Sequence, residues 1–270
     1  MSTNLTDVAA FTSPVVAPAA GDPRTAASVV AAVQPLADRT RWLLGAVAGY
    51  LQWSGRLRVG AATTGLGVYV GAIDAAVIGT SVLSQAAETE VAGSLPLASL
   101  STWLYVYAYD NAGALALQVS ADAPDAARTW KSTGDGTHRY LGCFRTDGSG
   151  APIYLSTTRG TARWLTAPAA RAALSAGNAT SATSVACAAY APPHARLVCV
   201  STLATESGAA PATYSLFETT TGAAQVQHRA PASQSVSHSA EIVCTSAQAV
   251  AYLCSTTDVA LTVYVDGWRE

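Results

Sequence analysis

Charge is scarce in this sequence. Asp, Glu, Lys and Arg make up 12% of its 270 residues, about half of the roughly 25% that is usual in soluble proteins. Lys131 is the only lysine, and the formal net charge is -2. Nucleic acid is therefore not an expected partner, because its binding depends on clusters of Lys and Arg that neutralise phosphates. So few charges are typical of a protein that buries much of its surface against neighbours, since exposed charge normally keeps a monomer soluble.

Long apolar runs are also missing. No stretch reaches the about 20 apolar residues that a membrane-spanning helix needs, so we expect no insertion into a membrane. Residues 1–8 have neither a positively charged start nor an apolar core, which argues against a secretory signal. We therefore expect assembly in the cytoplasm.

Spacing of the metal-binding type is absent among cysteines and histidines. Disulfides between neighbouring strands remain one alternative for the cysteines, but burial as small hydrophobic residues in a reducing cytoplasm fits their apolar surroundings better. His228 and His238 bracket a polar segment, where a metal would need further ligands. No metal site is predicted. The sequence has an odd number of cysteines, five in all: Cys143, Cys187, Cys199, Cys244 and Cys254.

Motifs for catalysis and nucleotide binding are absent as well. None of the four histidines lies beside a serine or cysteine in a nucleophile motif. Ser149 follows Asp147 in a Gly-rich stretch that lacks the pattern of a nucleophile elbow and predicts a turn. The glycines of residues 65–71 are spaced one residue too far apart for a dinucleotide fingerprint, and no helix follows them. We expect no cofactor and no enzyme activity.

Two pairs of carboxylates are candidates for a glycan-cleaving site, because such a site needs only two of these groups. Glu88 and Glu90 would lie on one face of a strand, and Asp122 and Asp125 flank a proline in a loop. Solvated charge is the usual role of such residues, so we predict no catalytic residue among them.

The first 55 residues differ in character from the rest. Residues 1–21 contain prolines in extended segments and predict an arm that becomes ordered against a partner. Asp22 before Pro23 predicts a helix start, and Pro35 divides the apolar pattern that follows into two short helices. These helices have no partner helix elsewhere, so we assign the region to attachment and self-association. The residues expected to make the contacts are Pro23, Val29, Val33, Leu36, Trp42 and Leu43.

From residue 56 onward the pattern is that of β-strands. Short apolar or alternating stretches follow one another between turn signals, which favours sandwiches or jelly rolls. An alanine-rich stretch with few β-branched residues, 166–182, predicts a linker. The predicted fold is mainly β: an extended arm and short helices in residues 1–55, then two antiparallel β-sandwich, jelly-roll-like domains in residues 56–165 and 183–270.

Residues 101–120 predict a β-hairpin with two different faces. Trp103, Tyr105, Tyr107 and Tyr109 alternate with aliphatic residues and so project to one side of the strand. The turn falls at residues 110–113, since Asn and Gly tolerate positive φ. The aromatic row fits a packed core or an interface between subunits, where large side chains fill the space between sheets. Contact with a glycan, by stacking on sugar rings, is the alternative.

Several passages together resemble structural proteins of tailed bacteriophages, in which tail-fibre-like and head-decorating proteins carry such segments. The amino-terminal passages are Asp22-Pro-Arg-Thr-Ala-Ala-Ser-Val29 and Pro35-Leu-Ala-Asp-Arg-Thr-Arg-Trp-Leu43. The β-module passages are Trp103-Leu-Tyr-Val-Tyr-Ala-Tyr-Asp-Asn-Ala-Gly113 and Arg139-Tyr-Leu-Gly-Cys-Phe-Arg-Thr-Asp-Gly-Ser-Gly150. The closing passage is Val263-Tyr-Val-Asp-Gly-Trp-Arg-Glu270.

The resemblance implies a non-enzymatic, trimeric component of a phage particle that attaches through its amino-terminal region to capsid or tail proteins. The chain has no repeats and no extended shaft, which favours a short spike, a capsid decoration or a tail-attached protein over a long fibre. The alternative from another class is a module that recognises a glycan on the host surface. A depolymerase or esterase would need a carboxylate pair or serine triad that the sequence does not display.

Overall fold

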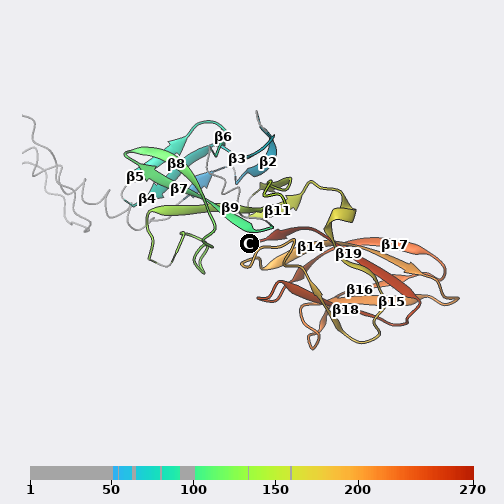
Figure 1. Ribbon diagram of the computed structural model, residues 1–270. Coiled ribbons are helices and arrows are strands. Elements are labelled where there is room, and N and C mark those ends of the chain that lie inside the picture. The colour runs from blue at the N-terminus through green and yellow to red at the C-terminus, as the bar shows by residue number, and fades with distance from the viewer. Residues whose placement is uncertain are drawn as a thin grey trace, which may run out of the picture.

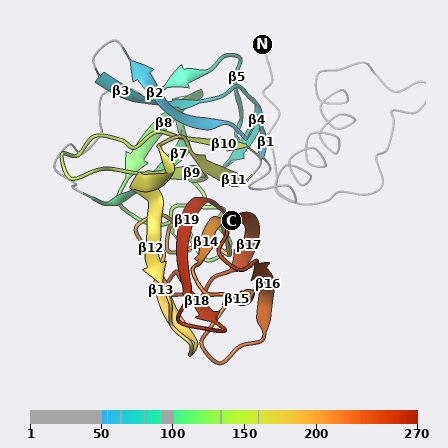
Figure 2. The ribbon, with the colours of Figure 1, turned by 90° about the vertical axis from the view of Figure 1, so that its right-hand side faces the viewer.

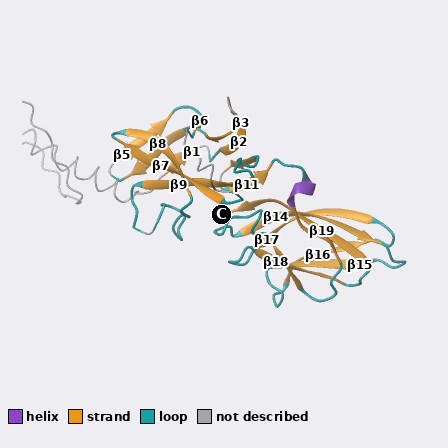
Figure 3. Ribbon diagram, in the orientation of Figure 1, coloured by secondary structure: helices purple, strands orange, loops and turns teal. Residues whose placement is uncertain are grey.

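The computed structural model describes residues 51–270, except residues 54, 63–64, 80, 92–100, 133 and 159. The predicted arm and helices of residues 1–50 lie outside this part of the chain. The described residues are mainly β, arranged in several antiparallel sheets with one short 3-10 helix, η1 (Figure 3). Among them, no helix is long and apolar enough to cross a membrane. The strands gather into an N-terminal lobe, residues 51–164, and a C-terminal lobe, residues 172–270 (Figure 1).

Short strands form the N-terminal lobe. One sheet has the order β1 (Leu51–Trp53), β4 (Ile73–Ile78), β5 (Ser81–Gln85). A second has the order β8 (Ala114–Ser120), β7 (Trp103–Asn111), β9 (His138–Arg145). A ladder completes the lobe with β11 (Thr161–Trp164), β10 (Leu155–Thr158), β2 (Leu57–Ala62), β3 (Gly65–Val70) and β6 (Thr89–Glu90). Fully buried side chains hold these sheets together, among them Leu57, Ile73, Leu104, Phe144 and Leu155.

The predicted hairpin is present as β7 and β8. Asn111 pairs with Ala114, so the turn consists of Ala112 and Gly113, whose φ angles are 54° and 88°. The prediction gave positive φ to Asn111 and Gly113, and only Gly113 has it. Ala112 adopts it in place of Asn111, because the pairing makes Ala112 and Gly113 the central residues of the turn, and a type I′ turn requires positive φ at both. Asp110 stabilises the turn by accepting the backbone N–H of Gly113 at 2.6 Å.

Two sheets face each other in the C-terminal lobe (Figure 1). One contains β12 (Ala172–Gly177), β19 (Val259–Arg269), β14 (Leu197–Glu206) and β17 (Ser235–Val243). The other has the order β13 (Thr183–Ala186), β18 (Ala249–Cys254), β15 (Ala212–Phe217), β16 (Ala224–Ala230). Buried and half-buried residues alternate along β19, as expected for a strand with one face on a core. Its buried residues pack with those of the second sheet, including Tyr214 and Leu216.

β19 belongs to both lobes. Its first part, through Tyr264, pairs with β12, and its last part, Gly267 to Arg269, pairs with β11 of the N-terminal lobe. The hydrogen-bonded ladder therefore continues from β17 at one end of the molecule to β6 at the other. A shared strand couples the lobes more tightly than a single-chain linker would.

The segment predicted as a linker, residues 166–182, contains η1 (Pro168–Arg171) and β12. Figure 2 shows β12 running beside β19. The physical reason is that strand pairing depends on the neighbouring strand and on burial more than on intrinsic propensity, and Leu174 packs against the core. The boundary at residue 55 also shifts, because β1 pairs with β4 and is part of the N-terminal lobe.

All five cysteines are buried and free. This confirms the interpretation that they are small buried hydrophobic residues.

Candidate functional site

The aromatic row of β7 turns inward in its middle. Tyr105 is 3% exposed and Tyr107 is 0% exposed. The Tyr107 hydroxyl donates to the backbone oxygen of Asp122 at 2.7 Å. Burial raises the pKa of both phenols well above the usual range. Neither ring presents a free face on which a sugar could stack.

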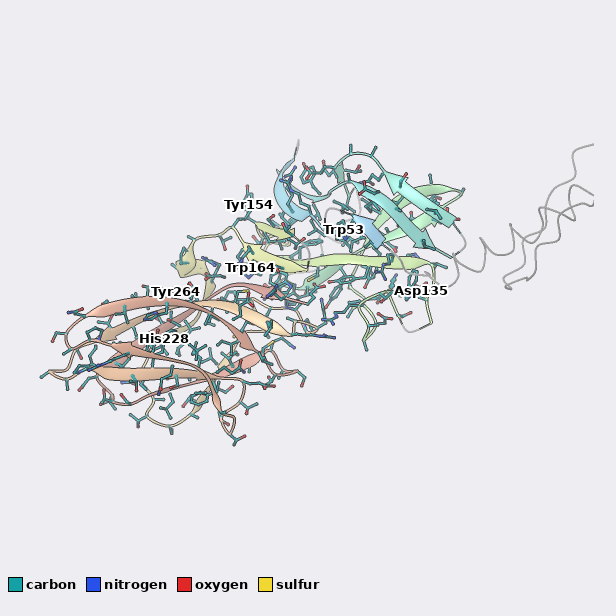
Figure 4. All side chains as sticks on the ribbon, turned by 180° about the vertical axis from the view of Figure 1, so that it is seen from behind. Trp53, Asp135, Tyr154, Trp164, His228 and Tyr264 are labelled. Carbon is teal, nitrogen blue, oxygen red and sulfur yellow. The ribbon has the colours of Figure 1, made fainter. Side chains whose placement is uncertain are left out.

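Trp103, at the start of the row, reaches the other lobe. Its ring meets Trp268 edge-on, with the ring centroids 5.1 Å apart, and lies 5.9 Å from that of Trp164. The indole N–H of Trp103 donates to the backbone oxygen of Ala188, and that of Trp164 donates to the backbone oxygen of Tyr190, both at 3.0 Å. Figure 4 shows Trp164 where the lobes meet. Each aromatic pair of this kind contributes about 0.5–1.5 kcal/mol beyond its burial.

A polar cluster makes a second contact between the lobes. Tyr140 and Cys143 come from β9, His194 from the loop before β14, and Glu270 follows β19. The Tyr140 hydroxyl donates to Glu270 Oε1 at 2.8 Å and lies 2.9 Å from His194 Nε2. His194 Nε2 and Cys143 Sγ lie 3.0 Å and 3.8 Å from the same carboxylate oxygen. We call these four residues the junction cluster.

The junction cluster is not arranged for nucleophilic catalysis. Burial raises the pKa of the Cys143 thiol well above its usual value, and the nearby Glu270 carboxylate raises it further. A nucleophilic cysteine needs the opposite, a lowered pKa beside a cationic group. The thiol also directs its hydrogen bond to Glu270 and not to His194. The Cys143 thiol of the junction cluster is therefore neutral.

The second ring nitrogen of His194 indicates the tautomer. Nδ1 is buried and has no hydrogen-bond partner among the described residues. A proton on Nδ1 would be a buried donor without an acceptor, which costs about 1–3 kcal/mol. The contacts therefore favour a proton on Nε2, donated to Glu270.

His228 and His238 meet in the C-terminal lobe. Their rings stack with centroids 3.8 Å apart and an interplanar angle of 1°. Both rings also lie near Tyr214. Parallel rings point their nitrogen lone pairs side by side and not at a common point, so the stacked pair is not a chelate. In the part of the chain that the structure describes, no further His, Cys, Asp or Glu joins them in a group that could hold a metal.

An open hollow of about 490 Å³ lies at the far end of the aromatic row. Tyr109 and His138 line it with stacked rings whose centroids are 5.5 Å apart. His138 Nδ1 lies 3.2 Å from a carboxylate oxygen of Asp135. Asp110, also in the wall, accepts a hydrogen bond from the Ser81 hydroxyl. The hollow combines a ring face with polar groups, and Tyr109 is the only half-buried tyrosine of the row.

Glu88 and Glu90 do not form an acid pair. Arg58 Nε donates to Glu88 Oε1 at 3.0 Å, and this hydrogen bond lowers the pKa of Glu88. Glu90 lies on β6 opposite Tyr69. Arg58 therefore holds the Glu88 side chain, while Glu90 is placed by the pairing of β6 with β3.

The loop carboxylates stabilise local structure. Asp122 accepts a hydrogen bond from Ser120 and lies 3.3 Å from the Lys131 ammonium, and both contacts lower its pKa. Asp125 accepts the backbone N–H of Thr129 at 2.8 Å. Ser149 stands in a turn, as predicted, and its hydroxyl donates to Asp147.

Sequence reasoning missed the junction cluster. Its contacts join residues 54, 76 and 127 positions apart, so no local spacing could indicate them. The predicted attachment residues, Pro23, Val29, Val33, Leu36, Trp42 and Leu43, lie outside the described residues.

No model of a known protein family matches the chain, and no curated protein matches it.

Proposed function

We propose that the protein is a non-enzymatic structural component of a tailed phage particle, either a capsid decoration or spike or a tail-attached, fibre-like protein. In this proposal residues 1–55 anchor the chain to capsid or tail proteins, and two β-sandwich, jelly-roll-like domains project from the anchor. The protein assembles as a homotrimer in the host cytoplasm and ends in the virion.

The observation that carries the proposal is the sharing of β19 between the two lobes. A projecting particle component has to hold its domains in a fixed relation. The continuous ladder, the three packed indoles and the junction cluster all serve that end. A two-domain enzyme more often keeps a cleft with reactive groups between its domains. The hollow of about 160 Å³ between these lobes is lined by Trp164, Arg171 and Tyr190 among others, and no cysteine, histidine or carboxylate is among its described lining residues.

The low charge supports assembly with other chains. Only 12% of the residues are charged, and a surface of this kind favours association. The proposal that this assembly is a phage particle rests on the resemblance of the amino-terminal passages to phage structural proteins.

The test asks whether the protein is present in purified particles and whether it forms a trimer. We expect antibody detection of the chain in density-purified virions of its phage, and light scattering of the purified protein at the mass of a trimer. Leu36→Asp and Leu43→Asp should reduce both the trimer and its incorporation. Val82→Asp is the matched control, because Val82 is an exposed valine of the N-terminal lobe. A stable monomer that is absent from purified particles contradicts the proposal.

Glycan recognition is the second candidate, and the hollow beside Tyr109 favours it. The combination of a tyrosine face with Asp110, Ser81 and His138 suits a sugar ring, which presents a flat apolar face and a rim of hydroxyls. Tyr109→Ala should abolish binding on an array of host glycans and slow adsorption. Tyr154→Ala is the control, because Tyr154 is an exposed tyrosine elsewhere in the lobe. Equal loss in both variants, or no binding by the unaltered protein, contradicts this candidate.

A further inference from the structure

We propose that Cys143, His194 and Glu270 bind a zinc ion that ties the two lobes together. Their Sγ, nitrogen and carboxylate oxygen atoms all lie within 4.8 Å of one another. Cys143 belongs to the N-terminal lobe, while the other two residues belong to the C-terminal lobe. Metal binding goes beyond the structural role proposed above and does not depend on it.

The spacing of the donor atoms fits a tetrahedral ion. Zinc bonds of about 2.0–2.3 Å at tetrahedral angles place neighbouring ligand atoms roughly 3.3–3.7 Å apart. His194 Nε2 and Glu270 Oε1 are 3.0 Å apart, and Cys143 Sγ and Glu270 Oε1 are 3.8 Å apart. The third pair, Cys143 Sγ and the His194 nitrogen, lies within 4.8 Å, so these two ligands have to approach each other by up to about 1 Å to complete the coordination sphere.

The ligand types select zinc. A thiolate and an imidazole favour a borderline-soft ion, whereas magnesium and calcium prefer oxygen ligands alone. Cys143 loses its thiol proton to solvent when the ion binds, and Glu270 binds as a carboxylate. The two negative charges balance the charge of Zn²⁺, so a neutral unit replaces a single half-buried carboxylate. Binding therefore releases one proton from Cys143, and affinity should rise with pH.

The remaining contacts of the cluster define the bound form further. Coordination through Nε2 moves the ring proton of His194 to Nδ1, which is buried and has no acceptor among the described residues, so zinc binding has to offset the cost of that unpaired donor. Tyr140 places its hydroxyl 2.8 Å from Glu270 Oε1. The fourth ligand of the ion is either the Tyr140 hydroxyl or a water. Zinc binding by the Tyr140→Phe variant distinguishes the two.

The first experiment measures metal content. The full chain is produced in zinc-supplemented medium and dialysed. Bound metal is then measured by inductively coupled plasma mass spectrometry. We expect one zinc per chain, with retention that weakens in Cys143→Ser and Glu270→Gln. Cys143→Ser is a mild change to the free cluster, because a serine hydroxyl can still donate to Glu270. Cys244→Ser is the matched control: it is a buried cysteine whose replacement hydroxyl keeps the hydrogen bond to the backbone oxygen of Ala195.

The second experiment reads the ligands directly. Cobalt added to the metal-free protein should produce a thiolate-to-cobalt charge-transfer band, together with the strong visible bands of a tetrahedral ion. Both should disappear in Cys143→Ser, persist in Cys244→Ser, and be competed away by zinc. Protein without metal after zinc supplementation and without a cobalt–thiolate band overturns the proposal, as do bands that survive Cys143→Ser. Detection of the chain in virions is a separate readout, so failure of one proposal leaves the other distinguishable.

Discussion

Gly267 of β19 lies against the backbone of β11, where the two lobes meet. A Cβ atom at this position would lie 1.9 Å from the backbone oxygen of Ala162 and 2.9 Å from its carbonyl carbon. Neither atom can move without separating β19 from β11. Glycine is therefore required here by close approach and not by its φ angle.

Gly267→Ala should destabilise the protein by about 3 kcal/mol or more, at the upper end of the range for forced overpacking. Urea unfolding followed by far-ultraviolet circular dichroism measures the change. Gly148→Ala is the control, since a Cβ at Gly148 would meet no atom within 4 Å. A midpoint for Gly267→Ala that equals that of the control would contradict the close approach.

The stacked pair of His228 and His238 makes stability depend on pH. Burial and the neighbouring ring lower the pKa of His228, and its Nε2 is buried without a partner among the described residues. The folded state thus binds a proton less readily than the unfolded state, whose histidine has a pKa of about 6.5. Stability is fully present above that pH and is lost as the pH falls toward the lowered pKa of the folded state.

The midpoint temperature of thermal unfolding should decrease as the pH is lowered from about 7.5 to about 5. His228→Phe keeps a ring against His238 and Tyr214 but cannot take up a proton, so part of this dependence should disappear. Differential scanning calorimetry across the pH series measures it. Identical pH profiles for the two proteins would show that the pair does not contribute.

At the scale of elements, η1 and β12 are joined to β19 by an ion pair between a buried arginine and a half-buried aspartate. Arg171 is 8% exposed, and its Nη1 lies 2.6 Å from Asp266 Oδ1. Ser201 of β14 donates to the same carboxylate oxygen at 3.2 Å. This pair sets the position at which the chain leaves one lobe and enters the other.

Asp266→Ala should cost about 3 kcal/mol, because removal of one partner leaves a buried guanidinium without its counter-charge. Asp266→Asn keeps an acceptor and should cost less. Glu241→Ala removes the partner of Arg269 in an exposed pair and should change stability by about 0–1 kcal/mol. Chemical unfolding measures all three, and similar losses for Asp266→Ala and Glu241→Ala would refute the assignment.

Elements with a local signature could be predicted from the sequence. The alternation of residues 103–109 gave the hairpin, and turn signals gave the mainly β character. β12 could not be found, because its alanines carry no strand pattern and pair only where β19 is already present. The junction cluster was equally hidden, since His194 stands in a loop, Tyr140 and Cys143 lie on β9, and Glu270 follows β19.

The aromatic row shows what a two-residue sequence period can predict and what it cannot. Its period placed Trp103, Tyr105, Tyr107 and Tyr109 on one strand, but period alone does not say what a face contacts. The structure divides the row into an indole that meets the other lobe, two buried phenols, and a ring at a surface hollow. Tertiary packing assigned each residue its own surroundings.

At the scale of the whole molecule, the lobes should behave as one cooperative unit. They share β19, three indoles and the junction cluster. Opening either lobe therefore exposes surface that the other lobe covers.

Calorimetry should accordingly show a single unfolding transition with equal calorimetric and van't Hoff enthalpies. Trp103→Ala removes the ring that contacts both Trp164 and Trp268 and should lower stability by about 3 kcal/mol, with two transitions emerging. Trp130→Ala is the matched control, since Trp130 lies in the N-terminal lobe and contacts Arg139. Two transitions in the unaltered protein would contradict the coupling.

The position of β19 also has a mechanical consequence. All ten residues of β14 pair with it in antiparallel register, and its last residues continue into the ladder of β11. A pull along this strand loads many backbone hydrogen bonds in parallel, as in a shear joint, whereas a pull across it would peel them one after another. Tension along β19 therefore passes from the C-terminal lobe to the N-terminal lobe through its three residue pairs with β11, which are loaded in shear.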